Sequence, residues 1–155
     1  MKGNEKVIKT LNMLLADELS AIGQYMVHSE MCANWGYVKL HDIIKKRAIE
    51  EMKHAEKLIE RILFLEGIPD VSSMEKVVIG NDLEHQFKND RDAEESANSA
   101  YNKGISLCYD EGDNGSVELL RSILTDEEKH LDWLETQIDL IGKIGIKNYL
   151  VEQLH

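Results

Sequence analysis

A chain of 155 residues has the size of one domain and is long enough to bury a substantial core. Its formal charge of -11 argues against a surface for nucleic acid or anionic lipid, because such surfaces need clustered Lys and Arg. The only proline is Pro69, and strong helix formers dominate the remainder, so we expect an all-α protein with a single domain over residues 1–155.

The sequence shows no signal peptide or membrane span. The N-terminal stretch MKGNEKVIKT lacks the apolar region of a signal peptide, and no run of about 18 apolar residues is present that could span a membrane. We therefore expect a cytoplasmic protein with no membrane partner. Cys32 and Cys108 are too few and too far apart for a disulfide scaffold or a CxxC metal site, which predicts two reduced core residues.

Four long segments carry apolar residues three and four positions apart, the pattern of a helix with one buried face. Turn residues separate them at Asn34-Trp35-Gly36, at residues 111–115 (EGDNG) and between Gly67 and Asn81. The predicted helices cover about 5–33, 37–65, 83–111 and 116–142, followed by a short amphipathic helix at about 146–154. The four long helices are expected to form a bundle over about 5–142.

Each long helix places one glutamate on its apolar stripe, namely Glu18, Glu51, Glu94 and Glu127. In an antiparallel hairpin, two residues at one height have numbers that average to the turn. The mean of 18 and 51 is 34.5, and the mean of 94 and 127 is 110.5, so both averages fall at the predicted turns. The four carboxylates are therefore expected at one height of the bundle core.

The second hairpin repeats the first at an offset of 76 residues, which relates Glu18 to Glu94 and Glu51 to Glu127. The same offset relates His54 to His130, Tyr25 to Tyr101 and Cys32 to Cys108. The 17-residue connection over 66–82 reaches about 55 Å when extended, enough to follow a helix of about 42 Å. The second hairpin is thus expected to start at the far end of the bundle, with the two cysteines near opposite ends.

Four buried carboxylates would repel one another and lose hydration, so a neutralising partner is expected. Two divalent cations balance four carboxylates and leave two imidazoles as neutral donors, and this oxygen and nitrogen donor set suits iron or manganese. The alternatives are a solvated Glu-x-x-His pair and a buried salt-bridge network, but Lys and Arg are scarce at the facing positions. Tyr25 and Tyr101 are interpreted as core residues with a hydroxyl bond, and an electron or proton role near the metals is the alternative for Tyr25.

These motifs resemble the bacterioferritins, the haem-containing bacterial ferritins. The resemblance spans the chain through DELSAIGQY, EEMKHAEKLIERILFLEGIP, DEEKHLDWLETQIDLIGKIG and NYL. It implies a ferritin-like antiparallel four-helix bundle with a long crossover between the second and third helices and a short fifth helix. It also implies a ferroxidase that oxidises Fe²⁺ with O₂ or H₂O₂, and iron storage in a homo-oligomeric shell of 24 subunits built from dimers, alone or with a second subunit type. The implied ligands of two iron ions per subunit are Glu18, Glu51, His54, Glu94, Glu127 and His130.

Further family features follow from the same resemblance. Met52 is the implied ligand of a haem b shared between two subunits, with plain dimer packing as the alternative. A bacterioferritin-associated ferredoxin is the implied reducing partner. Lys46 and Glu50 occupy the positions where the family often has a His and an Asp as an inner-surface iron site, so Glu50 is an accessory candidate only. The implied pore between subunits is lined by Asn34, Glu66, Asp132 and Asp139.

Three other functions fit parts of the pattern. A rubrerythrin-like oxidase or peroxidase would be expected to carry paired CxxC motifs, which are absent. A DNA-protecting mini-ferritin usually builds its metal site between subunits, whereas here one chain supplies all six ligands. A metal-free helical assembly module would place four aligned glutamates in its core at a high free-energy cost.

Overall fold

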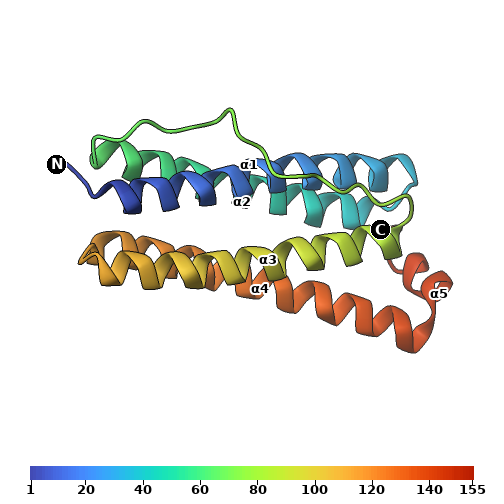
Figure 1. Cartoon of the computed structure of the whole chain (residues 1–155). Coiled ribbons are helices and arrows are strands. Elements are labelled where there is room, and N and C mark those ends of the chain that lie inside the picture. Colours follow the sequence, from blue (N-terminus) through green and yellow to red (C-terminus); the bar gives the residue numbers. More distant parts are fainter.

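A computed structural model describes all residues, Met1–His155, and contains helices and no strands. The helices are α1 (Glu5–Asn34), α2 (Val38–Phe64), α3 (Leu83–Asp110), α4 (Asn114–Ile144) and α5 (Ile146–Val151). The first four pack as a bundle, and α5 lies at the end of α4 (Figure 1). The expected all-α bundle with a long crossover and a short fifth helix is confirmed. No helix is long and apolar enough to cross a membrane.

The helices begin where side chains can accept the free backbone N–H groups of a first turn. Asn4 accepts such hydrogen bonds at α1, Asp82 at α3 and Asp113 at α4. Capping by Asp113 explains why α4 begins two residues earlier than expected. Gly145, with φ of +81°, ends α4 and starts α5, which is shorter than the predicted helix.

The bundle consists of two antiparallel hairpins, α1 with α2 and α3 with α4, and both turns lie at the predicted positions. The crossover after α2 runs back along the bundle, so that α3 begins beside the end of α1 (Figure 1). Three backbone N–H groups bind this crossover to one stripe of α1. Glu75 N donates to Ser20 Oγ at 2.8 Å, Val78 N to Gln24 Oε1 at 3.2 Å and Gly80 N to His28 Nε2 at 3.1 Å.

A buried polar group on α3 continues this stripe. Gln24 Nε2 donates to Asp90 Oδ1 at 2.8 Å, and His28 Nδ1 lies 2.9 Å from the same oxygen. Burial raises the pKa of Asp90, although its contacts with His28 and Gln24 oppose the shift. These contacts join the crossover, α1 and α3, and they place the crossover along the α1 side of the bundle.

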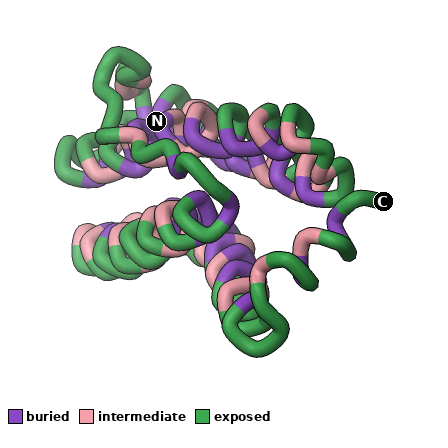
Figure 2. The backbone as a smooth tube through the Cα atoms, turned by 90° about the vertical axis from the view of Figure 1, so that its right-hand side faces the viewer, coloured by how far each residue is buried: buried purple, intermediate pink, exposed green.

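The apolar core is divided into two clusters. One contains Leu11, Leu58 and Cys108, and the other contains Leu40, Phe87 and Cys32. The buried faces of the helices point toward each other, and the outward faces are exposed (Figure 2). Both cysteines are buried and free, in different clusters, as expected for reduced core residues. Neither cluster includes the buried glutamates and histidines of the metal-centre prediction.

Candidate metal centre

The four long helices bring together all six residues predicted as metal ligands. Glu18 comes from α1, Glu94 from α3, and the two Glu-x-x-His pairs from α2 and α4. All six are buried among the helices. The ligand atoms form two groups, and within each group all atoms lie within 4.8 Å of one another. The first group consists of Glu18, Glu51, His54 and Glu127, and the second of Glu51, Glu94, Glu127 and His130. Glu51 and Glu127 are common to both groups, which is the arrangement needed for two neighbouring cations bridged by carboxylates.

Each imidazole directs Nδ1 toward the carboxylates. His54 Nδ1 lies 2.9 Å from Glu127 Oε1 and 3.7 Å from Glu18 Oε2. His130 Nδ1 lies 3.0 Å from Glu51 Oε1 and 3.6 Å from Glu94 Oε1. These contacts lack hydrogen-bond alignment, and both Nδ1 atoms remain without a hydrogen-bond partner. At least one oxygen of each of the four glutamates is also without one. Buried polar atoms normally find partners, so this inward-facing set has the donor chemistry of a cation site.

Two of the carboxylates accept a hydrogen bond from a tyrosine. Tyr101 OH donates to Glu18 Oε1, and Tyr25 OH donates to Glu94 Oε1, each at 2.5 Å. The 76-residue repeat therefore extends to these contacts, because each tyrosine of one hairpin bonds the glutamate of the other. Both rings are buried, which agrees with the interpretation of core residues with a hydroxyl bond.

Protonation of the metal-free cluster reflects its crowding. Burial raises the pKa of Glu94 to about 8, with the Glu127 carboxylate adding to the shift. Burial also raises the pKa of Glu18 well above its ordinary value, with the Glu51 charge adding to it. Burial acts to lower the pKa of His130, but its contacts with Glu127 and Glu51 outweigh this and raise it to about 11. Protons on these groups thus partly balance the buried negative charge in the absence of a metal.

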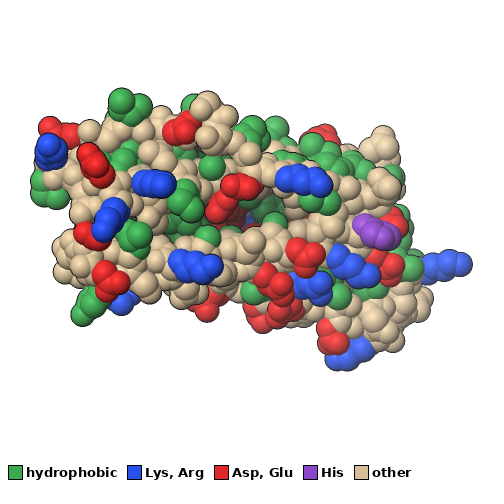
Figure 3. Space-filling model, in the orientation of Figure 1, with side chains coloured by type: hydrophobic (Ala, Val, Ile, Leu, Met, Phe, Trp, Pro, Cys, Tyr) green, Lys and Arg blue, Asp and Glu red, His purple; other side chains and the backbone are tan.

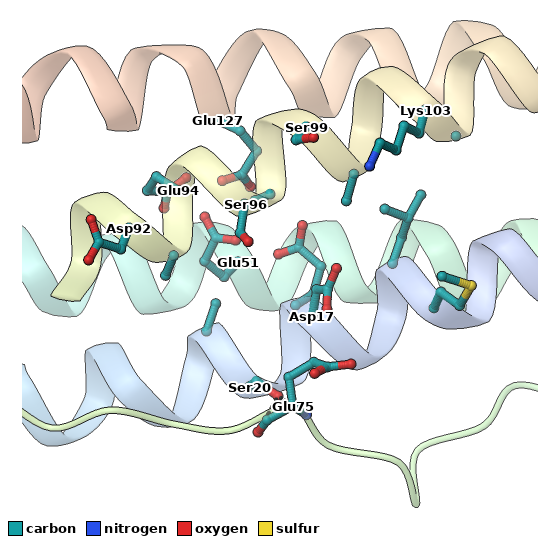
Figure 4. Close-up of a pocket in the computed structure, with 18 of the residues that line it drawn as sticks. Asp17, Ser20, Glu51, Glu75, Asp92, Glu94, Ser96, Ser99, Lys103 and Glu127 are labelled. Atoms are coloured by element: carbon teal, nitrogen blue, oxygen red, sulfur yellow. Dashed lines mark hydrogen bonds between the residues drawn. The ribbon is translucent and has the colours of Figure 1, made fainter.

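A cleft of about 680 Å³ leads to the cluster between α1 and α3. The space-filling view shows a hollow with acidic side chains near the middle of this face (Figure 3). Glu51, Glu94 and Glu127 converge at its floor, while Asp17 and Glu75 lie where the crossover passes α1 (Figure 4). Burial raises the pKa of Asp17 to about 6, and the nearby charge of Glu75 contributes. The carboxylates are therefore reachable from the surface of the subunit through a passage lined by Asp17, Glu75 and Asp92 together with Lys76 and Lys103.

Sequence reasoning missed Asp17 and Glu75 as residues of this passage, since Glu75 belongs to a segment without helical periodicity. It also missed Asp126, whose Oδ2 lies 2.9 Å from His54 Nε2. A signal for Asp126 was present, because Asp126 is separated from Glu50 by the same 76 residues as the other repeated pairs. Glu50, the accessory candidate, places its Oε2 2.6 Å from His130 Nε2.

The other predicted positions lie away from the centre. Met52 is 45% exposed on α2, one turn from the exposed Ile49, and Met26 is exposed on α1. Asn34 lies at the end of α1, Glu66 lies just beyond the end of α2, and Asp132 and Asp139 are exposed on α4. One subunit does not bring these four residues together, so the predicted pore requires neighbouring subunits.

The fold and the site define a class of protein: a four-helix bundle with a buried carboxylate and imidazole centre assembled from all four helices. The family model for the ferritin-like domain matches residues 8–144 of this chain. A bacterioferritin of Brucella melitensis is 41% identical over 96% of this chain and 92% of its own length. Bacterioferritins of Mycobacterium leprae and Rhodobacter capsulatus are 39% and 40% identical over 96% of this chain, covering 94% and 92% of their own lengths. The chain belongs to the ferritin-like family and, within it, to the bacterioferritins.

Proposed function

We propose that this protein stores iron and acts as a ferroxidase, oxidising Fe²⁺ at the centre formed by Glu18, Glu51, His54, Glu94, Glu127 and His130. The observation that carries the proposal is the pair of overlapping ligand groups that share Glu51 and Glu127. Membership of the bacterioferritins supports iron as the metal. The carboxylates of Asp17 and Glu75 along the cleft would attract Fe²⁺, and the oxygen and nitrogen donors at its floor suit that ion.

The residues have distinct roles in this proposal. Glu18 with His54 and Glu94 with His130 would hold one Fe²⁺ each, and Glu51 and Glu127, which belong to both ligand groups, would serve both ions. Two Fe²⁺ ions lose one electron each, and these two electrons with two protons reduce H₂O₂ to two waters or O₂ to H₂O₂. Tyr25 and Tyr101 hold the Glu94 and Glu18 carboxylates in place through their hydroxyl groups. The Fe³⁺ product would be deposited as mineral inside a shell of 24 subunits in the cytoplasm.

Fe²⁺ is proposed to reach the centre through the cleft between α1 and α3. Asp17 and Glu75 place carboxylates along the passage, and the floor consists of the ligands themselves. Negative side chains that line a narrow passage raise the local concentration of a cation. The proposed pore of Asn34, Glu66, Asp132 and Asp139 would form a separate route between subunits.

The haem proposal concerns Met52. Its thioether lies on an exposed part of α2 near the exposed Ile49, so a second subunit could approach it across an apolar surface. One chain offers a single Met52 sulfur, and a twofold interface would bring the Met52 of a second subunit to the same haem, so that the two thioethers would hold it. The haem b would provide an electron-transfer group there, and the bacterioferritin-associated ferredoxin is the proposed electron donor.

Rapid Fe²⁺ oxidation in single-site variants tests the ferroxidase proposal. Glu18→Ala and Glu127→Ala should assemble to the same size as the wild type and lose the fast phase of oxidation after anaerobic Fe²⁺ loading and exposure to air. Glu128→Ala is the matched control, because Glu128 follows Glu127 in the chain and is exposed. Wild-type initial rates of Fe²⁺ oxidation in both ligand variants would contradict the assignment of the ferroxidase centre to these residues.

Size-exclusion chromatography with absorbance at protein and haem wavelengths tests the remaining parts. A shell elutes as a very large particle with a Soret band, and Met52→Leu should keep the particle while losing the band. A small dimer would contradict the storage proposal, and a retained haem spectrum in Met52→Leu would exclude Met52 as the axial ligand.

A further inference from the structure

The outer nitrogen of each imidazole at the centre contacts a carboxylate that is not one of the proposed metal ligands. His54 Nε2 lies 2.9 Å from Asp126 Oδ2, and His130 Nε2 lies 2.6 Å from Glu50 Oε2. Both contacts cross between hairpins, since His54 and Glu50 belong to α2 and Asp126 and His130 belong to α4. Two equivalent contacts therefore link α2 to α4 beside the centre.

The carboxylates of these contacts differ from the ligands in their surroundings. The side chains of Asp126 and Glu50 are 48% and 36% exposed, whereas the side chains of His54 and His130 are 3% and 4% exposed. Each carboxylate thus reaches from the surface to the edge of a buried ring. These residues lie on α2 and α4, while the cleft that leads to the centre is lined mainly by α1 and α3.

The contact determines which nitrogen of a neutral ring carries the hydrogen. An ionised carboxylate can only accept hydrogen bonds, so the ring nitrogen beside it must carry the hydrogen. For a neutral His54 or His130, the hydrogen on Nε2 leaves the lone pair on Nδ1, which points toward the glutamates. A metal binds an imidazole through such a lone pair, and an outer partner of this kind usually orients the ring.

The third buried histidine provides an internal comparison. His28 Nδ1 lies 2.9 Å from Asp90 Oδ1, and its Nε2 accepts a hydrogen bond from Gly80 N at 3.1 Å. Both nitrogens of His28 are therefore occupied by protein groups, as in a structural histidine. At His54 and His130 only Nε2 is engaged, and Nδ1 has no hydrogen-bond partner.

We propose that Asp126 and Glu50 are positioning residues, which hold His54 and His130 in the orientation and tautomer that present Nδ1 to the metal. This inference rests on the proposed function, because it assigns roles around the same centre. Asp126 serves the site of Glu18 and His54, and Glu50 serves the site of Glu94 and His130. Neither residue belongs to the two ligand groups of the centre, so each acts there through the imidazole that it contacts.

Binding of Co²⁺ to the metal-free protein tests this role without relying on oxidation. Titration calorimetry gives the affinity and the number of ions bound per subunit, and the visible absorption of bound Co²⁺ reports its ligand geometry. Asp126→Ala and Glu50→Ala should each weaken one of two Co²⁺ sites about 10- to 100-fold and alter its absorption. Asp126→Asn and Glu50→Gln keep an oxygen acceptor for Nε2–H, so they should recover part of the lost affinity.

The controls separate positioning from general damage. Glu128→Ala removes an exposed carboxylate from α4 that contacts neither imidazole, and it should bind Co²⁺ as the wild type does. Thermal unfolding of each metal-free variant reports whether the bundle remains intact, and the two amide variants keep the test decisive if an alanine variant unfolds. Wild-type affinity and absorption in both alanine variants would overturn the positioning role while leaving the ferroxidase proposal in place. Failure of the wild type to bind Co²⁺ would instead remove the metal centre and, with it, the positioning role.

Discussion

The hydroxyl group of Tyr101 allows a quantitative test of how the buried glutamates are stabilised. Tyr101 is fully buried, and its OH donates to Glu18 Oε1, while Glu18 Oε2 has no hydrogen-bond partner. Tyr101→Phe keeps the ring and removes this donor, leaving the Glu18 carboxyl group without a hydrogen bond. Removing one partner of a buried hydrogen bond leaves the other group unsatisfied and costs about 1–3 kcal/mol, so we expect a loss of this size in the free energy of unfolding of the metal-free protein.

Tyr149→Phe is the matched control. Tyr149 is also buried, but its OH donates to the neutral amide oxygen of Gln137 at 2.7 Å. Gln137 is only half-buried, so water can replace the lost donor, and the cost should be about 0.5–1.5 kcal/mol. Urea denaturation at one fixed protein concentration measures both variants, because assembly makes apparent stability depend on concentration. Tyr101→Phe should therefore be the more destabilising substitution.

A double-mutant cycle identifies the source of the effect. Introducing Tyr101→Phe into a Glu18→Ala background should cost much less than introducing it into the wild type, because the acceptor is already gone. An equal cost in both backgrounds would show that Tyr101 stabilises the core through its packing alone. A cost no larger than that of Tyr149→Phe would likewise refute the reasoning that the Tyr101 hydroxyl satisfies an otherwise unpaired buried carboxyl group.

Three further substitutions or titrations test the fold. Gly80→Ala places a Cβ 2.4 Å from the Gln86 backbone nitrogen, so it should lower the free energy of unfolding in urea by about 1–3 kcal/mol. Gly23→Ala places a Cβ with no neighbour within 4 Å in helix α1, so it should raise the free energy of unfolding. Burial raises the pKa of Cys32 to about 12 and the pKa of Cys108 to about 11. Both thiols should therefore resist a thiol-specific dye at pH 8 until the protein unfolds, and rapid labelling of the folded protein would contradict this. Because the unfolded thiols ionise first, stability should fall as pH rises from about 9 toward these values. Arg61→Ala removes a 2.7 Å bond to Asp113 and should cost about 1.5 kcal/mol by the same denaturation assay. Burial acts to raise the pKa of Asp113, but its hydrogen bonds with Ser116 and Arg61 outweigh this and lower it. The stability that the Arg61–Asp113 ion pair contributes should therefore be present above about pH 4 and disappear as Asp113 is protonated. A loss of stability in Arg61→Ala that is independent of pH would argue against the ion pair.

Local patterns in the sequence were sufficient to predict the helices and their pairing. The spacing of apolar residues predicted four long helices, and Asn, Asp and Gly marked the turns, because both signals depend on neighbouring residues only. The equal offset of 76 residues then placed Glu18, Glu51, Glu94 and Glu127 at one height. All six candidate ligands followed from this repeat, and the structure brings them within reach of common cations.

Sequence periodicity did not predict every group that surrounds the ligands. Asp126 contacts His54 only because α2 and α4 pack side by side with a particular rotation, and helical periodicity does not specify which exposed carboxylate reaches a neighbouring helix. The cleft with Asp17 and Glu75 likewise depends on the path of the crossover, which has no repeating pattern and is held to α1 by backbone hydrogen bonds. Sequence periodicity therefore determined which residues are buried together, whereas tertiary packing decided their orientation, their outer partners and their access to solvent, because these depend on contacts between segments far apart in the chain.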